Sequence, residues 1–123
     1  MAVTTPFHRE AMIVAPPGFW RDALVSLVRA QPRLCVSQVQ DDLAAARATL
    51  DGENVDIVIV DSSGDEQHLL DFLAWLGATH PAAGCVIAVD TQVQQARYVA
   101  AGARATLLKG CLDETQLRSA ISV

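Results

Sequence analysis

The 123-residue sequence predicts a single α/β domain, a three-layer α/β/α sandwich built around a doubly wound, five-stranded parallel sheet. Short apolar runs of four to six residues alternate along the chain with segments of helical period. Proline, glycine and aspartate residues separate these segments. The run at residues 55–60 has almost no polar side, which is typical of a strand covered by helices on both faces of a parallel sheet.

The first two strand–helix units follow from turn residues and apolar spacing. A strand at residues 11–15 ends at a Pro-Pro-Gly turn, because proline cannot donate to a sheet ladder. The helix predicted at residues 19–30 carries one apolar stripe, made of Phe19, Ala23, Leu24, Leu27 and Val28. The strand at residues 34–39 alternates in the manner of a half-buried strand. Asp41-Asp42 then precedes an alanine-rich helix in a position to cap it.

The remaining three units repeat this alternation. They are predicted as strands at residues 55–60, 86–89 and 105–108 and helices at residues 69–76, 93–101 and 113–121. Gly102 stops the fourth helix, and Asp113 precedes the fifth as its cap. Five strands that alternate with helices are joined by right-handed crossovers, so all five run in parallel.

Composition and charge limit what the chain does. Hydrophobic residues make up 51% and charged residues 19%, which excludes global disorder. The net charge of −5 is opposite to that of a domain that grips DNA phosphates, so we expect no direct nucleic-acid contact. We find no apolar stretch that matches a membrane span or a signal-peptide core, and expect a cytoplasmic location. We place an N-terminal extension at residues 1–10 and the domain at residues 11–123.

Charged residues follow three of the predicted strands. Asp61 ends the third, Asp90 the fourth and Lys109 the fifth. Because binding sites of doubly wound sheets lie at the carboxyl ends of the strands, two carboxylates and one ammonium group are expected at one rim.

The segments Val-Asp-Ile-Val-Ile-Val-Asp, which ends at Asp61, and Gly-Ala-Arg-Ala-Thr-Leu-Leu-Lys, which ends at Lys109, resemble receiver domains of two-component response regulators. The resemblance runs from about Ala11 to Val123. Phe19-Trp20-Arg21 is similar to the first helix of the subclass with helix-turn-helix output domains. The resemblance implies a flavodoxin-like (CheY-like) fold with strand order 2-1-3-4-5. It also implies a role in phosphorelay signalling that regulates transcription.

The resemblance assigns roles to two residues that match the family. Asp61 falls on the phospho-acceptor, which receives a phosphoryl group from a histidine kinase. Lys109 falls on the lysine that contacts that phosphoryl group.

Four other family positions are altered. The acidic pair that helps to hold Mg²⁺ falls on Ala15 and Pro16, whose side chains cannot ligate a hard cation. The hydroxyl residue that ends the fourth strand falls on Asp90, and the aromatic switch residue falls on Thr106. About three residues are missing before Gly102, so we expect the fourth helix to be short or displaced. We therefore expect weak or absent Mg²⁺-dependent phosphorylation of Asp61.

The leading hypothesis is an atypical receiver domain: a signalling and protein-interaction module without enzymatic activity, cofactor or metal. Its partner would be a histidine kinase or another regulator. One alternative is a phosphorylatable receiver with Asp61 as acceptor in a phosphorelay. Another is a small-ligand-binding module that uses the rim around Ala15, Pro16 and Asp90.

Two further questions concern the rim and a contact face. Asp61, Lys109 and Asp90 either form an ionic cluster that holds one conformation, or Asp90 points to solvent. A homodimer would use the face formed by residues 93–101, 105–108 and 113–121. The candidate contact residues on this face are Tyr98, Val99, Leu117 and Ile121, although core packing is favoured for Val99 and Leu117.

Other chemistry finds no support in the sequence. His8, His68 and His80 are not at metal-ligand spacing, and the three cysteines are too few for a disulfide framework. No glycine-rich phosphate loop or nucleophile elbow is present. Cys111 follows the positive Lys109, but we expect it to be buried, and we expect Trp75 to serve in packing.

Overall fold

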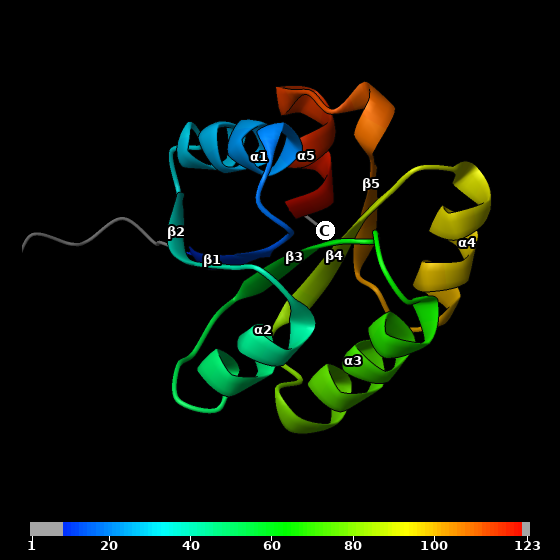
Figure 1. Cartoon of the computed structure of the whole chain (residues 1–123). Helices are drawn as coiled ribbons and strands as arrows, with labels where there is room; N and C mark the ends of the chain where they lie inside the picture. Colours follow the sequence, from blue (N-terminus) through cyan, green and yellow to red (C-terminus); the bar gives the residue numbers. More distant parts are fainter. Residues whose placement is uncertain (1–8, 122–123) are drawn as a thin grey trace, which may run out of the picture.

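The computed structural model describes residues 9–121 (Figure 1). Its strands are Arg9–Val14 (β1), Leu34–Gln40 (β2), Ile57–Asp61 (β3), Gly84–Val89 (β4) and Ala105–Leu108 (β5). Its α-helices are Phe19–Arg29 (α1), Leu43–Leu50 (α2), Glu66–Thr79 (α3), Gln92–Ala100 (α4) and Glu114–Ile121 (α5), with a short 3₁₀ turn at Lys109–Cys111 (η1). None of these helices is long and apolar enough to cross a bilayer.

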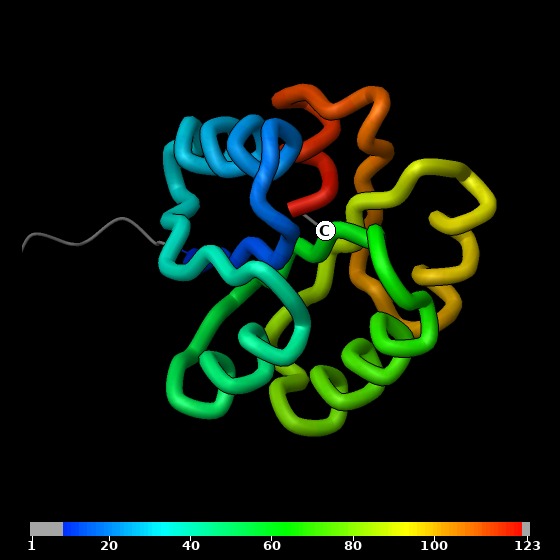
Figure 2. The backbone as a smooth tube through the Cα atoms, in the orientation of Figure 1, coloured from blue at the N-terminus to red at the C-terminus, as the bar shows by residue number. Residues whose placement is uncertain are grey.

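The strands form one parallel sheet in the order β2-β1-β3-β4-β5, which confirms the predicted topology. Helices α1 and α5 cover one face, and α2, α3 and α4 lie on the other side (Figure 1). The backbone trace shows the chain passing back and forth between the sheet and these two helical layers (Figure 2). The predicted three-layer sandwich is therefore confirmed.

Each face of the sheet has its own apolar core, and β3 contributes to both. Val58 and Val60 pack among residues of α2, α3 and α4, while Ile57 and Ile59 pack among residues of α1 and α5. Successive side chains of a strand point to opposite faces, so a continuous apolar run fits only a strand covered on both sides. This confirms the interpretation of the Val-Asp-Ile-Val-Ile-Val run.

Side chains cap four of the five α-helices as the local sequence requires. Asp42 accepts a hydrogen bond from the Ala45 amide at 2.8 Å, and Asp113 accepts one from the Gln116 amide at 2.7 Å. Thr91 and Gln94 form a reciprocal capping box at α4. Asp65 caps α3 through two backbone amides. Because of this cap, α3 begins at Glu66, three residues before the apolar run from which the helix was predicted.

The start of β1 differs from expectation in an informative way. β1 begins at Arg9, within the predicted extension, because the Arg9 amide donates to the Arg33 carbonyl and Arg9 pairs with Leu34. Residues 1–8 of that extension lie outside the described residues. Helix α4, which was expected to be short or displaced, has nine residues and is shorter than α1 and α3.

The predicted apolar stripe of α1 is wrong at two positions. Phe19 is 96% exposed and Ala23 is also exposed, whereas Trp20 packs partly buried against the core. Residues Trp20, Leu24 and Val28 are spaced by four and share one helix face, while Phe19 and Ala23, one position earlier, are turned away by about 100°. The first turn of α1 therefore buries its indole and leaves the phenyl ring in solvent.

We predict that Leu24→Ala lowers the free energy of unfolding by about 2–5 kcal/mol, because it opens a cavity in the core. Phe19→Ala in the same helix should change it by less than about 0.5 kcal/mol. Urea unfolding of the two variants beside the wild type measures both values. A larger loss for Phe19→Ala than for Leu24→Ala would contradict this packing of α1.

Candidate functional site

Three adjacent strands deliver the predicted rim residues to one edge of the sheet. β3 ends at Asp61, β4 is followed by Asp90, and β5 is followed by Lys109 at the start of η1. Since β3 pairs with β4 and β4 pairs with β5 in parallel register, these three ends are neighbours. The structure thus brings together the carboxylates and the ammonium group that the sequence placed at this edge.

Asp61 and Lys109 form a direct ion pair in which Lys109 Nζ donates to Asp61 Oδ1. The side chains are only 7% and 17% exposed, respectively, so this pair lies largely out of water. The same Asp61 oxygen accepts a hydrogen bond from the Ser63 amide at 2.8 Å. Removing charges from water is costly, so a pair of this kind persists only when its members satisfy each other.

Lys109 has two further neighbours. Its Nζ lies 4.0 Å from Asp90 Oδ1 and 5.1 Å from the centroid of the Trp20 ring. Asp90 is 64% exposed, so its attraction to Lys109 is weakened by water. The geometry combines both expectations for Asp90: it is within ion-pair distance of Lys109, and much of its side chain still faces solvent. The indole face offers the ammonium group a cation–π contact that sequence reasoning did not identify.

Ala15 and Pro16, the positions predicted to lack the family's metal ligands, line one cavity with Asp61. Ala15 is also linked to a second ion pair. Ala15 is buried, and its carbonyl accepts a hydrogen bond from Arg21 Nη1 at 3.2 Å. The same Arg21 nitrogen lies 2.5 Å from Asp41 Oδ1. Arg21 therefore links the loop after β1 to the loop after β2. Asp41 serves in this link, and Asp42 alone caps α2.

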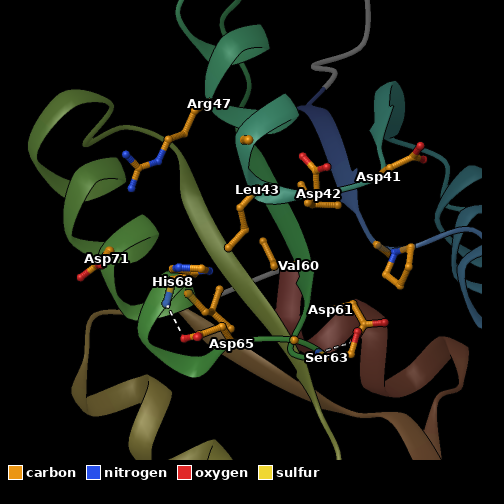
Figure 3. A pocket seen from close by; sticks show the side chains of 16 residues that line it. Asp41, Asp42, Leu43, Arg47, Val60, Asp61, Ser63, Asp65, His68 and Asp71 are labelled. Atoms are coloured by element: carbon orange, nitrogen blue, oxygen red, sulfur yellow. Dashed lines mark hydrogen bonds between the residues drawn. The ribbon is translucent and has the colours of Figure 1, made fainter.

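A cavity of about 730 Å³ opens between α2 and α3 next to Asp61 (Figure 3). Ala15 and Pro16 line it, as the ligand-binding alternative requires, but Asp90 does not belong to its lining. Leu43, Val60 and Leu69 contribute apolar surface. Figure 3 shows Asp61 on one side of the cavity, with Arg47 and Asp71 on the other.

The altered switch position Thr106 and the candidate contact residue Tyr98 differ in how deeply they are buried. Thr106 is half-buried on β5, where it pairs with Ile87 of β4. Tyr98 of α4 is fully buried in the core, and burial raises the pKa of its phenol. Two buried polar atoms near the rim, Trp20 Nε1 and Ser62 Oγ, have no hydrogen-bond partner among the described residues. Trp20 is thus held by packing and by Lys109.

The candidate contact face needs correction. Tyr98 and Ile121 were predicted as contact residues, but both are buried against the sheet and are not available to a partner. Leu117 is core, as favoured. Val99 was expected in the core but is 52% exposed, because Tyr98 beside it takes the inward position of α4.

Histidine and cysteine residues do not assemble into a site. Among residues 9–121, no group of three or more His, Cys, Asp or Glu side chains is arranged to hold a metal ion. His68 lines the cavity, His80 packs edge-on to the partly buried Trp75, and His8 lies outside the described residues. Cys111 is exposed, contrary to expectation, because η1 carries the chain away from the sheet.

Comparisons with known proteins give structural relatives only. No family model and no curated protein matches the chain. A receiver domain assigned to the response regulator NarL of Mycobacterium tuberculosis matches with a TM-score of 0.79 and 17% identity over 95% of each chain. The isolated receiver domain of RcsB from Salmonella enterica serovar Typhimurium, in the presence of BeF₃⁻, has a TM-score of 0.80 at 12% identity, over 94% of this chain and 86% of that one.

A LuxR-family two-component response regulator from Aurantimonas sp. SI85-9A1 matches with a TM-score of 0.78 and 21% identity, over 94% of this chain and 83% of that one. At these identities the likeness concerns the fold. The chain has the five-stranded, CheY-like fold of response-regulator receiver domains. Asp61 and Lys109 stand at the carboxyl edge of that fold.

We predict that Lys109→Ala lowers the free energy of unfolding by about 3 kcal/mol at neutral pH, because it leaves the buried Asp61 carboxylate unpaired. Arg97→Ala is the matched control, since it breaks the exposed pair with Glu66 and should cost less than about 1 kcal/mol. Urea unfolding measures both variants. Equal, small losses would show that the Asp61–Lys109 pair contributes no more than a surface contact.

We also predict that only two of the three thiols react in the folded protein. Burial raises the pKa of Cys85 to about 12, so at pH 8 its thiolate fraction is about one in ten thousand. Cys35 and Cys111 are exposed. Ellman's reagent should label two thiols in buffer and three in denaturant. Rapid labelling of all three without denaturant would contradict the burial of Cys85.

Proposed function

We propose that the chain is a receiver-type signalling module that acts through protein contacts and does not depend on Mg²⁺-assisted phosphorylation of Asp61. The observation that carries this proposal is the replacement of side-chain oxygens by Ala15 and Pro16 beside an aspartate already paired with Lys109. The receiver fold supports a signalling role, and no complete set of nucleophile, base and oxyanion donors supports an enzyme.

The donors at this edge do not fit the Mg²⁺ ion that receiver domains employ. Mg²⁺ requires oxygen ligands in near-octahedral geometry. Neither Ala15 nor Pro16 supplies a side-chain oxygen, and the Ala15 carbonyl already accepts a hydrogen bond from Arg21. One oxygen of Asp61 is bound to both Lys109 and the Ser63 amide. We therefore assign no metal cofactor to this site.

The charges around Asp61 also disfavour a phosphoryl group. Phosphoryl transfer depends on positive groups that neutralise its equatorial oxygens. Asp90 instead brings a negative charge to within 4.0 Å of Lys109, the one ammonium group at this rim within the described residues. A deficit of about 4 kcal/mol in transition-state stabilisation slows a reaction about 10³-fold.

The two residues at the family's switch positions also disfavour a phosphorylation-driven switch. Asp90 lacks the hydroxyl and Thr106 lacks the aromatic ring of the family pattern. Lys109 is engaged by Asp61 and lies over Trp20. These contacts support a domain that stays in one conformation. A protein partner, such as a histidine kinase or another regulator, would recognise the surface of that conformation. Regulation would then come through the partner or through a domain joined to this one.

The test is intact-protein mass after incubation with acetyl phosphate and Mg²⁺. We expect no phosphoryl adduct on the wild type under conditions that label a conventional receiver domain included as a positive control. An adduct that disappears in Asp61→Asn would overturn the proposal and support the phosphorylatable alternative.

A rescue variant tests the physical cause. We expect Ala15→Asp combined with Pro16→Asp and Asp90→Ser to gain an Asp61 adduct, because these changes add metal ligands and remove the opposing charge. A melting curve must first show that the variant folds, since Ala15 is buried. A folded variant that stays unlabelled would refute the missing ligands as the cause.

The small-ligand alternative also stays a prediction. The cavity beside Asp61 has the volume of a metabolite site and is lined by Ala15 and Pro16. A metabolite that binds there would raise the melting temperature of the wild type, and Ala15→Leu would abolish that rise by filling the cavity.

A further inference from the structure

A second, smaller cavity lies at the amino-terminal edge of the sheet, at the opposite end from Asp61. It has a volume of about 340 Å³ and sits between the start of β1, the turn from α1 to β2 and the end of α5. Its lining consists of Arg9, Gln31, Pro32, Arg33, Leu34, Arg118 and Ile121. None of the residues predicted for the rim at the carboxyl edge lines it.

The cavity concentrates positive charge in an acidic chain. Three of the nine Lys and Arg residues line it, although the net charge of the whole chain is −5. Among residues 9–121, none of its lining residues is acidic. Guanidinium groups match carboxylate and phosphate oxygens in a planar, two-pronged geometry, so such a cluster favours an anion.

Arg33 and Arg9 retain donors for a ligand. The Arg33 side chain is exposed and makes no hydrogen bond or ion pair with another residue of the described part of the chain. Arg9 uses Nη1 to reach the Ile121 carbonyl, which engages one of its five N–H groups. Arg118 is engaged by Glu114, so we assign it no ligand contact.

Nearby negative groups reduce this charge. Glu114 offsets one arginine, and the carboxyl ends of α1 and α5 each contribute about half a negative charge. The arginines that line this cavity therefore suit a small anion better than a polyanion.

The floor of the cavity is apolar. Leu34 and Ile121 are buried core residues, and Pro32 adds a ring beside them. Gln31 is only 5% exposed and donates through Nε2 to the Leu27 carbonyl at 3.2 Å, so a buried carboxamide is fixed in the wall. A site with an apolar floor and a few fixed polar groups is typical of small-molecule pockets.

We propose that this amino-edge cavity binds a small organic anion. Its carboxylate or phosphate group would lie against Arg33 and Arg9, and a short apolar body would rest on Leu34 and Ile121. The proposal does not depend on the state of Asp61, because the two sites lie at opposite ends of the strands.

The test uses benzoate and phenyl phosphate as probes and neutral benzamide as the control with the same ring. In ¹H–¹⁵N spectra of the full chain, we expect both anions to shift the amides of Arg33 and Leu34 in a saturable manner. The chemical shifts of the Asp61 and Lys109 amides should not change. The ratio of the two affinities tells whether a carboxylate or a phosphate is preferred.

Matched variants separate binding from helix capping. Arg33→Gln should weaken benzoate binding at least about tenfold, whereas Arg97→Gln, an exposed arginine of α4, should leave it unchanged. Equal binding of benzamide and benzoate, or shifts confined to Lys109, would overturn the proposal. So would unchanged binding in Arg33→Gln, which would show that the arginines only stabilise the ends of α1 and α5.

Discussion

The ion pair between Lys109 and Asp61 organises the carboxyl edge of this domain. It joins the end of β3 to the exit of β5 with very little exposure to water. A charge so placed must have a partner, because an unpaired one would cost several kcal/mol. Trp20 covers the same ammonium group from α1, so three elements distant in sequence meet at one nitrogen. The Ser63 amide donates to the same Asp61 oxygen, and Asp90 lies 4.0 Å from the same ammonium nitrogen.

Acidic and basic residues gather at opposite ends of the strands. At the carboxyl edge, aspartates are engaged as helix caps or are paired with Lys109 and Arg21. At the amino edge, arginines gather around a small cavity with no acidic residue in its lining among residues 9–121. The proposed function rests on the carboxyl edge, where Asp61 is already paired with Lys109. The proposed anion site rests on the amino edge.

Much of the fold was predictable from the sequence because local rules and burial agree. The unbroken apolar run of β3 requires cover on both faces, and Asp42 and Asp113 cap the helices that they precede. The convergence of Asp61, Asp90 and Lys109 followed from parallel strands alone. Predictions failed where two adjacent residues competed for one inward position. Trp20 took that position from Phe19, and Tyr98 took it from Val99.

The sequence by itself determined the order of the elements, the edge at which charged residues collect, and the absence of metal ligands at Ala15 and Pro16. These depend on residue type and on periods of two and 3.6, which are local properties. Only the tertiary structure decided that Trp20 lies over Lys109, that Arg21 joins two loops, and that Arg9, Arg33 and Arg118 share a cavity. Such contacts join residues far apart in the chain, so their distances are set by how the helices pack on the sheet.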